Sequence, residues 1–537
     1  MMAMESVPVP DLGYKATIGQ CISRAARLFG DRDFVVLPGQ RMTFAEADRA
    51  SRSLAKTMLA SGIGKGTRVG LFYTYGVDWV VAWLAASRIG ALVMPFSTIY
   101  TPAELRTVLG IGDVSVLFCP ATLLGKDMGL FLEEAVPGLS GYENTPLFVP
   151  ELPYLRSIWM TGPTERSWAT KLSEIDDSLG PTVDDRLLDA VEESVVPADL
   201  ATVVYTSGSS ALPKGVVHSH SAIVSTTAFF GESVLNNQSS VVFCAFPFFW
   251  IGGFLVLGGA LQAGLTVCCL ERFEPGSALD MVEEEQCTMI AAWPSLIQSM
   301  RTHPSARHRN LDHCPILTSG PSDIALVGTP VPGVPGHRGM SETVGNWFGV
   351  ERIIVDAETG ERLDDGKEGE LLIRGYGVTQ GYYKKEREEV FDPDGWLHTG
   401  DRCFMFENRP YFVGRFYEMI KSRGANVSPR EVELVLEGSA DIAHALVFGL
   451  PHPEMEEEVT AVIVPAPGAN PDPDFIRAYG RSQLSSYKVP TRIEILGQES
   501  EIPWLASGKP DKQALKARYK ATVDLDRDEA GDSIASG

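Results

Sequence analysis

The segment YTSGSSALPKG at 205–215 carries the residues whose types and spacing most directly point to chemistry. Hydroxyl and backbone N–H donors follow the apolar run TVVY, and they belong to Thr206, Ser207, Gly208, Ser209 and Ser210. Such donors bind phosphate oxygens, and Lys214 adds a positive charge, so the segment predicts a polyphosphate-binding loop. It is not a Walker loop, because Pro213 occupies the position of the second glycine. On composition alone, a flexible turn is an equally good interpretation.

Four further segments with candidate catalytic residues follow in order along the chain. They are GMSET at 339–343, GWLHTGD at 395–401, GRFYEMIKSRGANVSPREVE at 414–433 and ASGKPDK at 506–512. Each alone has an ordinary structural interpretation: Glu342 at a helix start stabilises the helix dipole, and a lysine such as Lys509 is usually solvated. His398 is interpreted as a packed structural residue. Five ordered segments together make a chance arrangement implausible.

These segments resemble the signature motifs of the adenylate-forming superfamily, which contains acyl-CoA synthetases, the adenylation domains of nonribosomal peptide synthetases and firefly-type luciferases. The resemblance covers nearly the whole chain, including TPAELRTVL at 101–109. It implies an AMP-forming acid–thiol ligase that uses ATP, Mg²⁺ and coenzyme A. A carboxylic acid becomes an acyl adenylate, and the thiol of coenzyme A then takes the acyl group.

The resemblance also implies a role for individual residues. Lys509 would reach the α-phosphate and the acyl oxygens, Ser341 would contact the α-phosphate, and Glu342 would bind Mg²⁺. Asp401 would accept hydrogen bonds from the ribose hydroxyls, and Arg415 would contact the ribose or a phosphate. The remaining nucleotide contacts would be the loop residues named above together with Gly320, Pro321, Gly339 and Met340.

Two further groups of residues follow from the same resemblance. PFFWIGGF at 247–254 and AAWPSL at 291–296 would line an acyl pocket with Phe249, Trp250 and Trp293, although a core aromatic cluster is the alternative. This pocket favours a fatty or similarly bulky acid, with an aryl acid close behind. Glu418 would be the hinge of a rotating C-terminal domain. The loop for the coenzyme A step would comprise Ser422, Arg423, Gly424 and Ala425.

The sequence departs from the family pattern in several places. Ala211 replaces a glycine of the phosphate loop, Trp250 replaces a histidine, and Arg423 stands where relatives often have a small residue. The hinge reads Tyr417-Glu418 rather than Lys-Asp, and the segments on both sides of Glu342 are short. Two alternatives therefore stay open: an adenylating enzyme with an amine or carrier-protein acceptor, and a lapsed nucleotide-binding regulatory homologue. A carrier acceptor is disfavoured because the chain ends 28 residues after Lys509.

The sequence patterns around these residues predict an α/β fold. TFAEADRASRSLAKTMLASG at 43–62 predicts a helix opened by Thr43, and helix and strand patterns alternate after it, which predicts a mostly parallel sheet covered on both faces. ERIIVD and GELLIRG predict a small antiparallel subdomain near residue 350. We predict an N-terminal domain at 1–414, a smaller mobile α+β domain at 415–520 and a disordered acidic tail at 521–537.

Composition excludes several other classes of protein. The net charge of −23 argues against nucleic acid as a partner. Residues 233–270 are uncharged, yet polar and glycine positions divide them, so we expect a buried α/β core rather than a transmembrane segment. Eight scattered cysteines and an N-terminus without signal-peptide features favour the cytoplasm. A homodimer remains an alternative that the sequence leaves open.

Overall fold

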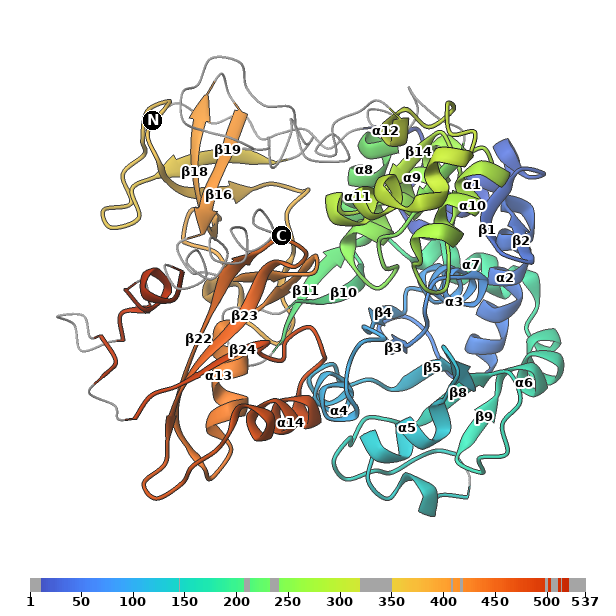
Figure 1. The fold of residues 1–537 in the computed structure, drawn as a ribbon. Helices are drawn as coiled ribbons and strands as arrows, with labels where there is room; N and C mark the ends of the chain where they lie inside the picture. Colours follow the sequence, from blue (N-terminus) through green and yellow to red (C-terminus); the bar gives the residue numbers. More distant parts are fainter. Residues whose placement is uncertain are drawn as a thin grey trace. The chain divides into compact units, whose positions relative to one another are not determined.

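The computed structural model describes residues 11–143, 145–206, 213–231, 241–318, 350–406, 409–415, 419–497, 501–503, 510–512 and 514–520 (Figure 1). The chain packs as two compact units. Unit 1 comprises residues 1–98, 105–205 and 215–414, and unit 2 comprises residues 99–104, 206–214 and 415–537. Each unit is described by itself below.

An eight-stranded sheet forms the centre of unit 1, with the strand order β17-β11-β10-β4-β3-β5-β8-β9. From β10 to β9 the neighbouring strands are parallel, whereas β17 joins β11 antiparallel through Val216 and Tyr382. The strands are β3 (Arg68–Leu71), β4 (Leu92–Pro95), β5 (Val116–Pro120), β8 (Ser157–Thr161), β9 (Ala169–Lys171), β10 (Leu200–Thr206), β11 (Lys214–Ser219) and β17 (Gly381–Tyr382). The predicted mostly parallel α/β sheet is confirmed.

A second sheet of unit 1 has five strands in the order β14-β12-β13-β1-β2. They are β1 (Asp33–Leu37), β2 (Gln40–Thr43), β12 (Val241–Cys244), β13 (Thr266–Cys268) and β14 (Met289–Ala291). β1 is parallel to β13, with Val35 opposite Val267. The sheet therefore joins the beginning of the chain to residues more than 200 positions later.

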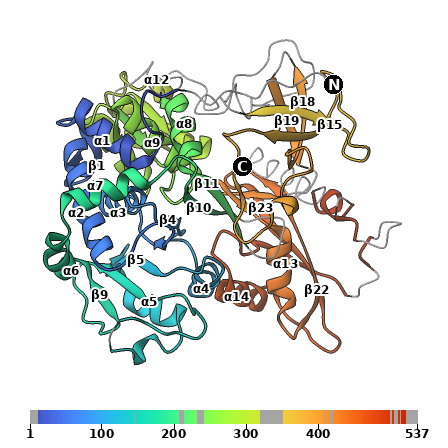
Figure 2. The same ribbon diagram turned by 180° about the vertical axis from the view of Figure 1, so that it is seen from behind.

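Helices cover these sheets, and the first three pack on one another (Figures 1 and 2). Thr43 and Glu46 form a reciprocal capping box at the start of α2, as expected for a helix opened by threonine. The helices are α1 (Ile18–Phe29), α2 (Phe44–Ala60), α3 (Val77–Arg88), α4 (Pro102–Ile111), α5 (Met128–Ala135), α6 (Leu172–Leu179), α7 (Asp185–Ser194), α8 (His220–Phe230), α9 (Ile251–Ala263), α10 (Pro275–Glu284), α11 (Pro294–Thr302) and α12 (Pro315–Thr318).

A buried cation joins the first helices. The side chain of Arg88 is fully buried at the end of α3, where it pairs with Asp48 and, at 2.9 Å, with Glu192. Its Nε donates to Ser51 Oγ at 3.0 Å. Because both carboxylates lie against the guanidinium, the charge is compensated inside the unit.

The third sheet of unit 1 is antiparallel, in the order β15-β16-β18-β19. Its strands are β15 (Glu351–Val355), β16 (Gly369–Arg374), β18 (Leu397–Phe406) and β19 (Arg409–Arg415). The small β subdomain predicted from ERIIVD and GELLIRG is thus present. A short hairpin of β6 (Thr122–Leu123) and β7 (Lys126–Asp127) lies elsewhere in unit 1.

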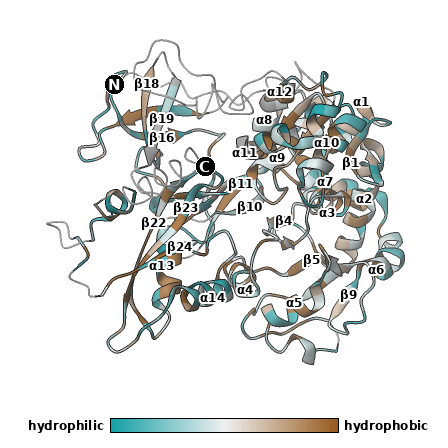
Figure 3. Cartoon of the chain, viewed as in Figure 1, coloured by the Kyte–Doolittle hydropathy of each residue, from teal (hydrophilic) through white to brown (hydrophobic). Residues whose placement is uncertain are grey.

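Unit 2 is an α+β unit around one sheet in which β21, β20, β23 and β22 are neighbours and β24 adds to β23. The elements are β20 (Ile420–Ser422), β21 (Ala425–Val427), α13 (Pro429–Glu437), β22 (Ile442–His452), β23 (Glu456–Pro465), α14 (Pro473–Gln483) and β24 (Arg492–Ile495). β22 and β23 form a long antiparallel pair of mostly hydrophobic residues (Figure 3). Both faces of this pair are apolar, because Ala445 and Val447 belong to one core cluster of the unit and Leu446 and Phe448 to another.

The uncharged stretch before Glu271 folds as β12, α9 and β13, in line with the expected α/β core. Among the residues that the structure describes, no helix is both long and apolar enough to span a bilayer. All eight cysteines are buried as free thiols. The predicted tail at 521–537 lies outside the described residues.

Candidate active site

The predicted phosphate loop is bracketed by β10 and β11, which are neighbours in the eight-stranded sheet. Thr206 is the exposed last residue of β10, and Lys214 is the half-buried first residue of β11. The Thr206 hydroxyl lies 3.5 Å from the carbonyl oxygen of Lys214. The structure thus brings the two ends of the loop together, while Ser207, Gly208, Ser209, Ser210 and Ala211 lie outside the described residues.

Asp401 lies in a bulge of β18. Residues 399–401 stand opposite the single residue Leu371, because Leu372 pairs with His398 and Glu370 pairs with Arg402. Gly400 adopts a φ of 71°, a left-handed conformation that glycine reaches without strain. β-Bulges commonly reorient a side chain next to an active site, and this one gives the GWLHTGD segment its shape.

Glu370 holds this bulge, and sequence reasoning missed it. One of its carboxylate oxygens accepts from the backbone N–H of Gly400 at 3.0 Å, and the other lies 2.9 Å from His398 Nδ1. The Thr399 hydroxyl donates to Leu371 O at 2.7 Å. His398 is therefore engaged with Glu370, but its side chain is exposed rather than packed as the sequence had predicted. The strand pattern of GELLIRG carried no sign of this contact, which depends on the bulge.

An aromatic cluster stands at the start of α9 and α11. Trp250 packs edge-on against Phe249 and Trp293, with ring centroids 5.4 and 5.6 Å apart, and Phe246 packs edge-on against Trp293 at 4.8 Å. Trp250 and Trp293 are half-buried, whereas Phe248 is almost fully buried. The three predicted pocket residues are thus brought together in unit 1, and Phe248 belongs to the core.

Sequence reasoning missed two neighbours in this region, Phe246 and Tyr75. The Tyr75 hydroxyl donates to Ala245 O at 2.7 Å, and its ring packs edge-on against Phe248. The aromatic run around 246–250 could have drawn attention to Phe246. Tyr75 is remote in sequence and meets the cluster only in the fold.

Both tryptophans occupy helix N-cap positions. Trp250 precedes α9 and Trp293 precedes α11, and neither side chain caps its helix. Ser or Thr caps the starts of α1, α8 and α13. A missing N-cap costs about 1 kcal/mol of helix stability. At these two contacting positions a tryptophan therefore stands in place of a residue that would stabilise the helix. Breaks of a local rule concentrate at functional sites.

Glycine allows the loop before α9 to approach this helix. A Cβ at Gly253 would lie 2.4 Å from Pro247 O and 2.6 Å from Phe248 Cα, too close for any side chain. The loop 247–250 therefore rests directly on the first turn of α9. This contact fixes the position from which Trp250 projects.

Two histidines near the phosphate loop are neutral in the fold. Burial lowers the pKa of His218 on β11 and of His220 at the start of α8 to about 4. His220 Nδ1 accepts from the backbone N–H of Ile18 at 3.3 Å. This contact connects α8 to α1, so His220 has a structural role in unit 1.

In unit 2, the segment Ser422 to Ala425 forms a two-residue hairpin turn between β20 and β21. Ser422 pairs with Ala425 across the turn. Arg423 and Gly424 have φ values of 54° and 77°, the signature of a type I′ turn. Arg415 ends β19, and its side chain is not among those described.

The other predicted site residues lie outside the described residues. These are Gly320, Pro321, Gly339, Met340, Ser341, Glu342, Glu418 and Lys509. Their roles remain predictions. Within the described part of the chain, no three His, Cys, Asp or Glu side chains are grouped as a metal site.

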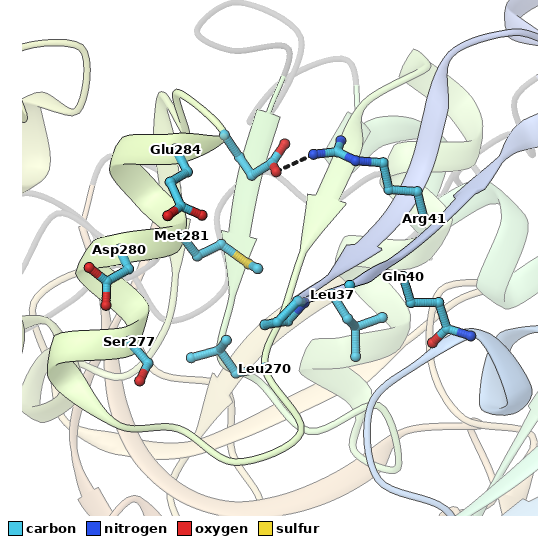
Figure 4. Close-up of a pocket in the computed structure, with 11 residues that line it drawn as sticks. Leu37, Gln40, Arg41, Leu270, Ser277, Asp280, Met281 and Glu284 are labelled. Atoms are coloured by element: carbon cyan, nitrogen blue, oxygen red, sulfur yellow. Dashed lines mark hydrogen bonds and ion pairs between the residues drawn. The ribbon is translucent and has the colours of Figure 1, made fainter.

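A hollow of about 690 Å³ opens elsewhere in unit 1, between the β1–β2 turn and α10 (Figure 4). Leu37, Leu270 and Met281 contribute apolar surface, and Arg41 pairs with Glu285 at its edge. No predicted site residue lines it. It is therefore distinct from the candidate active site.

Comparison with known proteins identifies the class of protein to which this chain belongs. The sequence profile of the AMP-binding enzymes matches residues 22–334, and that of the AMP-binding enzyme C-terminal domain matches residues 431–509. The chain belongs to the AMP-binding enzyme family, whose members form adenylates, and it is a ligase by class.

Individual relatives are distant but similar over their full length. The acyl-CoA ligase SID4 of Ajellomyces capsulatus is 27% identical over 97% of this chain and 94% of its own. A methyl-dioxo-octahydroindenyl-propanoyl:CoA ligase of Mycobacterium tuberculosis is 27% identical over 93% and 98%. The amide bond synthetase McbA of Marinactinospora thermotolerans has the same fold, with a TM-score of 0.73 and 22% identity over 94% and 99%.

Proposed function

We propose that this enzyme converts an apolar, bulky carboxylic acid to its coenzyme A thioester in two steps, with AMP and pyrophosphate as the other products. A fatty acid or a similarly bulky acid is the substrate class. The observation that carries the choice of acid is the Trp250–Trp293 contact with Phe246 and Phe249 around it. Apolar, aromatic-lined surface binds apolar ligands through the hydrophobic effect.

In the first step, a carboxylate oxygen attacks the α-phosphorus of ATP, and the bond from that phosphorus to the bridging oxygen of pyrophosphate breaks. The loop from Thr206 to Lys214 holds phosphate oxygens through hydroxyl and N–H donors. Lys509 stabilises the negative charge that builds up on the α-phosphate and acyl oxygens. Asp401 orients the ribose by accepting from its hydroxyls.

A divalent cation fits the donors that this proposal assigns to it. Glu342 and phosphate oxygens are the hard oxygen ligands that Mg²⁺ prefers, and no cluster of His, Cys, Asp and Glu in the described residues competes for it. When bound, Mg²⁺ neutralises part of the charge on the leaving pyrophosphate. Ser341 and Arg415 contribute further contacts to the nucleotide.

In the second step, the sulfur of coenzyme A attacks the acyl carbon, the bond from that carbon to the phosphate oxygen breaks, and AMP leaves. The thiol proton passes to solvent. The names of the curated relatives, which are acyl-CoA ligases, support coenzyme A as the acceptor. Rotation at Glu418 and the hairpin Ser422–Ala425 belong to this step, and we place the reaction in the cytoplasm.

Pyrophosphate release from ATP across a panel of aliphatic, aromatic and polycyclic acids tests the proposal. We expect release only with a suitable apolar acid, and formation of a thioester when coenzyme A is added. Hydroxylamine in place of coenzyme A tests an amine acceptor. Pyrophosphate release that does not depend on the acid, or no release with any acid of the panel, would overturn the enzymatic function. Either result would favour a nucleotide-binding regulatory role.

A further inference from the structure

The carboxylate of Glu370 in β16 joins this strand to the bulge of β18 that precedes Asp401. The side chain is 14% exposed, and each of its oxygens has a partner. One accepts from the backbone N–H of Gly400 at 3.0 Å, and the other lies 2.9 Å from His398 Nδ1. A mostly buried carboxylate with both oxygens engaged is held in one orientation. Both contacts fall on the residues just before Asp401.

A second attachment lies next to the first and involves the residue between these two contacts. The Thr399 hydroxyl donates to Leu371 O at 2.7 Å and accepts from the backbone N–H of Asp401 at 3.1 Å. Gly400, between Thr399 and Asp401, is left-handed, with a φ of 71°. The backbone that leads into Asp401 is therefore fixed to two consecutive residues of β16, Glu370 and Leu371.

Cross-strand charge pairing would have satisfied Glu370 in a different way. In the ladder of β16 and β18, Glu370 stands opposite Arg402, and opposite charges in such positions attract each other. The structure shows Arg402 Nε 3.6 Å from Glu368, while the Glu370 carboxylate accepts from the backbone of Gly400. The carboxylate thus serves the irregular part of the strand rather than the regular ladder.

We propose that Glu370 is a positioning residue for ribose recognition: through the bulge it holds Asp401 where the carboxylate of Asp401 accepts from both ribose hydroxyls of the nucleotide. This inference rests on the proposed function, which assigns the ribose to Asp401. Two hydrogen bonds to a vicinal diol need a carboxylate at a defined place, and a displacement of about 1 Å weakens both. Glu370 itself touches no substrate and acts through the backbone at 398–400.

Nucleotides without ribose hydroxyls reveal this role. In Glu370→Ala we expect the KM for ATP to rise about tenfold, as for loss of a hydrogen bond to a charged group. The KM for 2′,3′-dideoxy-ATP, which has no hydroxyl for Asp401 to bind, should stay at the wild-type value. The preference for ATP over the dideoxy nucleotide therefore falls about tenfold. An unchanged preference, whether both KM values rise together or neither rises, would overturn the proposal.

Two further variants connect the effect to Asp401. Glu370→Gln is nearly isosteric and keeps one oxygen for the Gly400 N–H, so the fold should be intact and the preference should fall by only about threefold. Asp401→Ala should lower the preference at least as far as Glu370→Ala does. Adding Glu370→Ala to Asp401→Ala should then change nothing further, because the two act in series. A second full loss in the double variant would show that Glu370 acts by another route and would overturn the proposal.

Glu351→Ala is the matched control. Glu351 lies in β15 of the same sheet, is 18% exposed and pairs with Arg374 of β16 at 2.8 Å. Its loss should lower the apparent Tm, as the loss of Glu370 does, and leave the preference for ATP unchanged. Loss of the preference in this variant as well would assign the effect to the stability of the sheet and overturn the proposal.

The proposed function can fail separately from this inference. Binding of AMP and of 2′,3′-dideoxy-AMP to the full chain is measured by calorimetry without acid or coenzyme A. If no acid supports pyrophosphate release, the proposed function fails, while a preference for AMP that is lost in Glu370→Ala still supports the positioning role. If turnover is found and the preference is the same in Glu370→Ala, the inference fails alone. Absence of any nucleotide binding would overturn both.

Discussion

Each unit of the molecule contains an arginine that sequence composition alone cannot distinguish from the other. In unit 1, Arg88 is fully buried between Asp48 and Glu192. In unit 2, Arg423 is exposed on a strained turn, and its described side-chain partner is the sulfur of Met455. The first arrangement satisfies the charge and holds helices together. The second leaves the charge exposed to solvent.

The comparison leads us to expect that Arg88 contributes to the stability of unit 1, whereas Lys509, the cation of unit 2 to which the proposed function assigns catalysis, contributes to chemistry. The aromatic cluster of unit 1 is the exception, because its tryptophans give up helix caps to form it. Substitutions in the two units should therefore affect different measurements. The expectations below run from the largest effect to the smallest.

Lys509→Ala is expected to have the largest effect on chemistry. Loss of the cation that stabilises the transition state should lower acid-dependent pyrophosphate release by roughly 100-fold or more. The unfolding midpoint should stay unchanged, because the proposed role of Lys509 is chemical. Measuring release and urea unfolding on the same preparation checks both. Retained release would remove Lys509 from the catalytic residues.

Arg88→Met is expected to have the largest effect on stability. It leaves the carboxylates of Asp48 and Glu192 without their cation, which should cost about 3–5 kcal/mol of unfolding free energy. Urea unfolding monitored by tryptophan fluorescence measures this cost. The matched control is Arg186→Met, whose pair with Asp184 is exposed and should not matter. Equal stability of the two variants would contradict a structural role for Arg88.

Lower pH should destabilise unit 1 through His220. Burial lowers its pKa to about 4 in the folded state, below the unfolded value of about 6.5. The stabilisation is complete above pH ~6.5 and is lost as the pH falls towards 4, about 3 kcal/mol in all. His220→Asn keeps an acceptor for the Ile18 N–H without titrating. Its stability should depend less on pH in melts between pH 7 and 4.5, and an unchanged dependence would assign the effect to other groups.

Trp250→Ala tests whether the aromatic cluster of unit 1 binds the acid. Removing aromatic surface from the cluster should raise the KM for an apolar acid about tenfold and leave the KM for ATP unchanged. Phe148→Ala removes an aromatic ring that is 64% exposed and serves as the control. If both variants keep the wild-type acid preference, the cluster is core packing rather than an acid-binding wall.

Leu124→Gly is expected to have the smallest effect. Leu124 is half-exposed at a left-handed position, so glycine should stabilise the protein by about 0.5–1 kcal/mol. Leu130→Gly, at a somewhat more exposed position in α5, should destabilise it by about 1 kcal/mol. Opposite signs in thermal melts would show that backbone conformation, rather than loss of leucine surface, decides the result.

Much of the fold could be predicted because the local patterns are strong. The Thr43 cap, the parallel βα units and the antiparallel ERIIVD and GELLIRG strands all follow from short-range sequence features. The pairing of β1 with β13 and of β17 with β11 could not, because nothing near Val35 or Tyr382 specifies a strand partner far away in sequence.

Some features of the candidate site could likewise be predicted from the sequence, and others could not. The contact between Trp250 and Trp293 joins two segments that the family resemblance had already indicated as the acyl pocket. The role of Glu370 depends on a bulge, and the strain of Arg423 depends on the register of β20 with β21. Both are properties of backbone geometry that residue types do not reveal.

The parallel pair of β1 and β13 has a consequence for biosynthesis. Val35 leaves the ribosome long before its partner Val267 has been made. At roughly 5–20 residues per second, the first strand waits for some 10–50 s with its apolar edge unpaired. Nascent chains that stop before residue 267 cannot complete this sheet, so the N-terminal strand is where we expect chaperones to bind during synthesis.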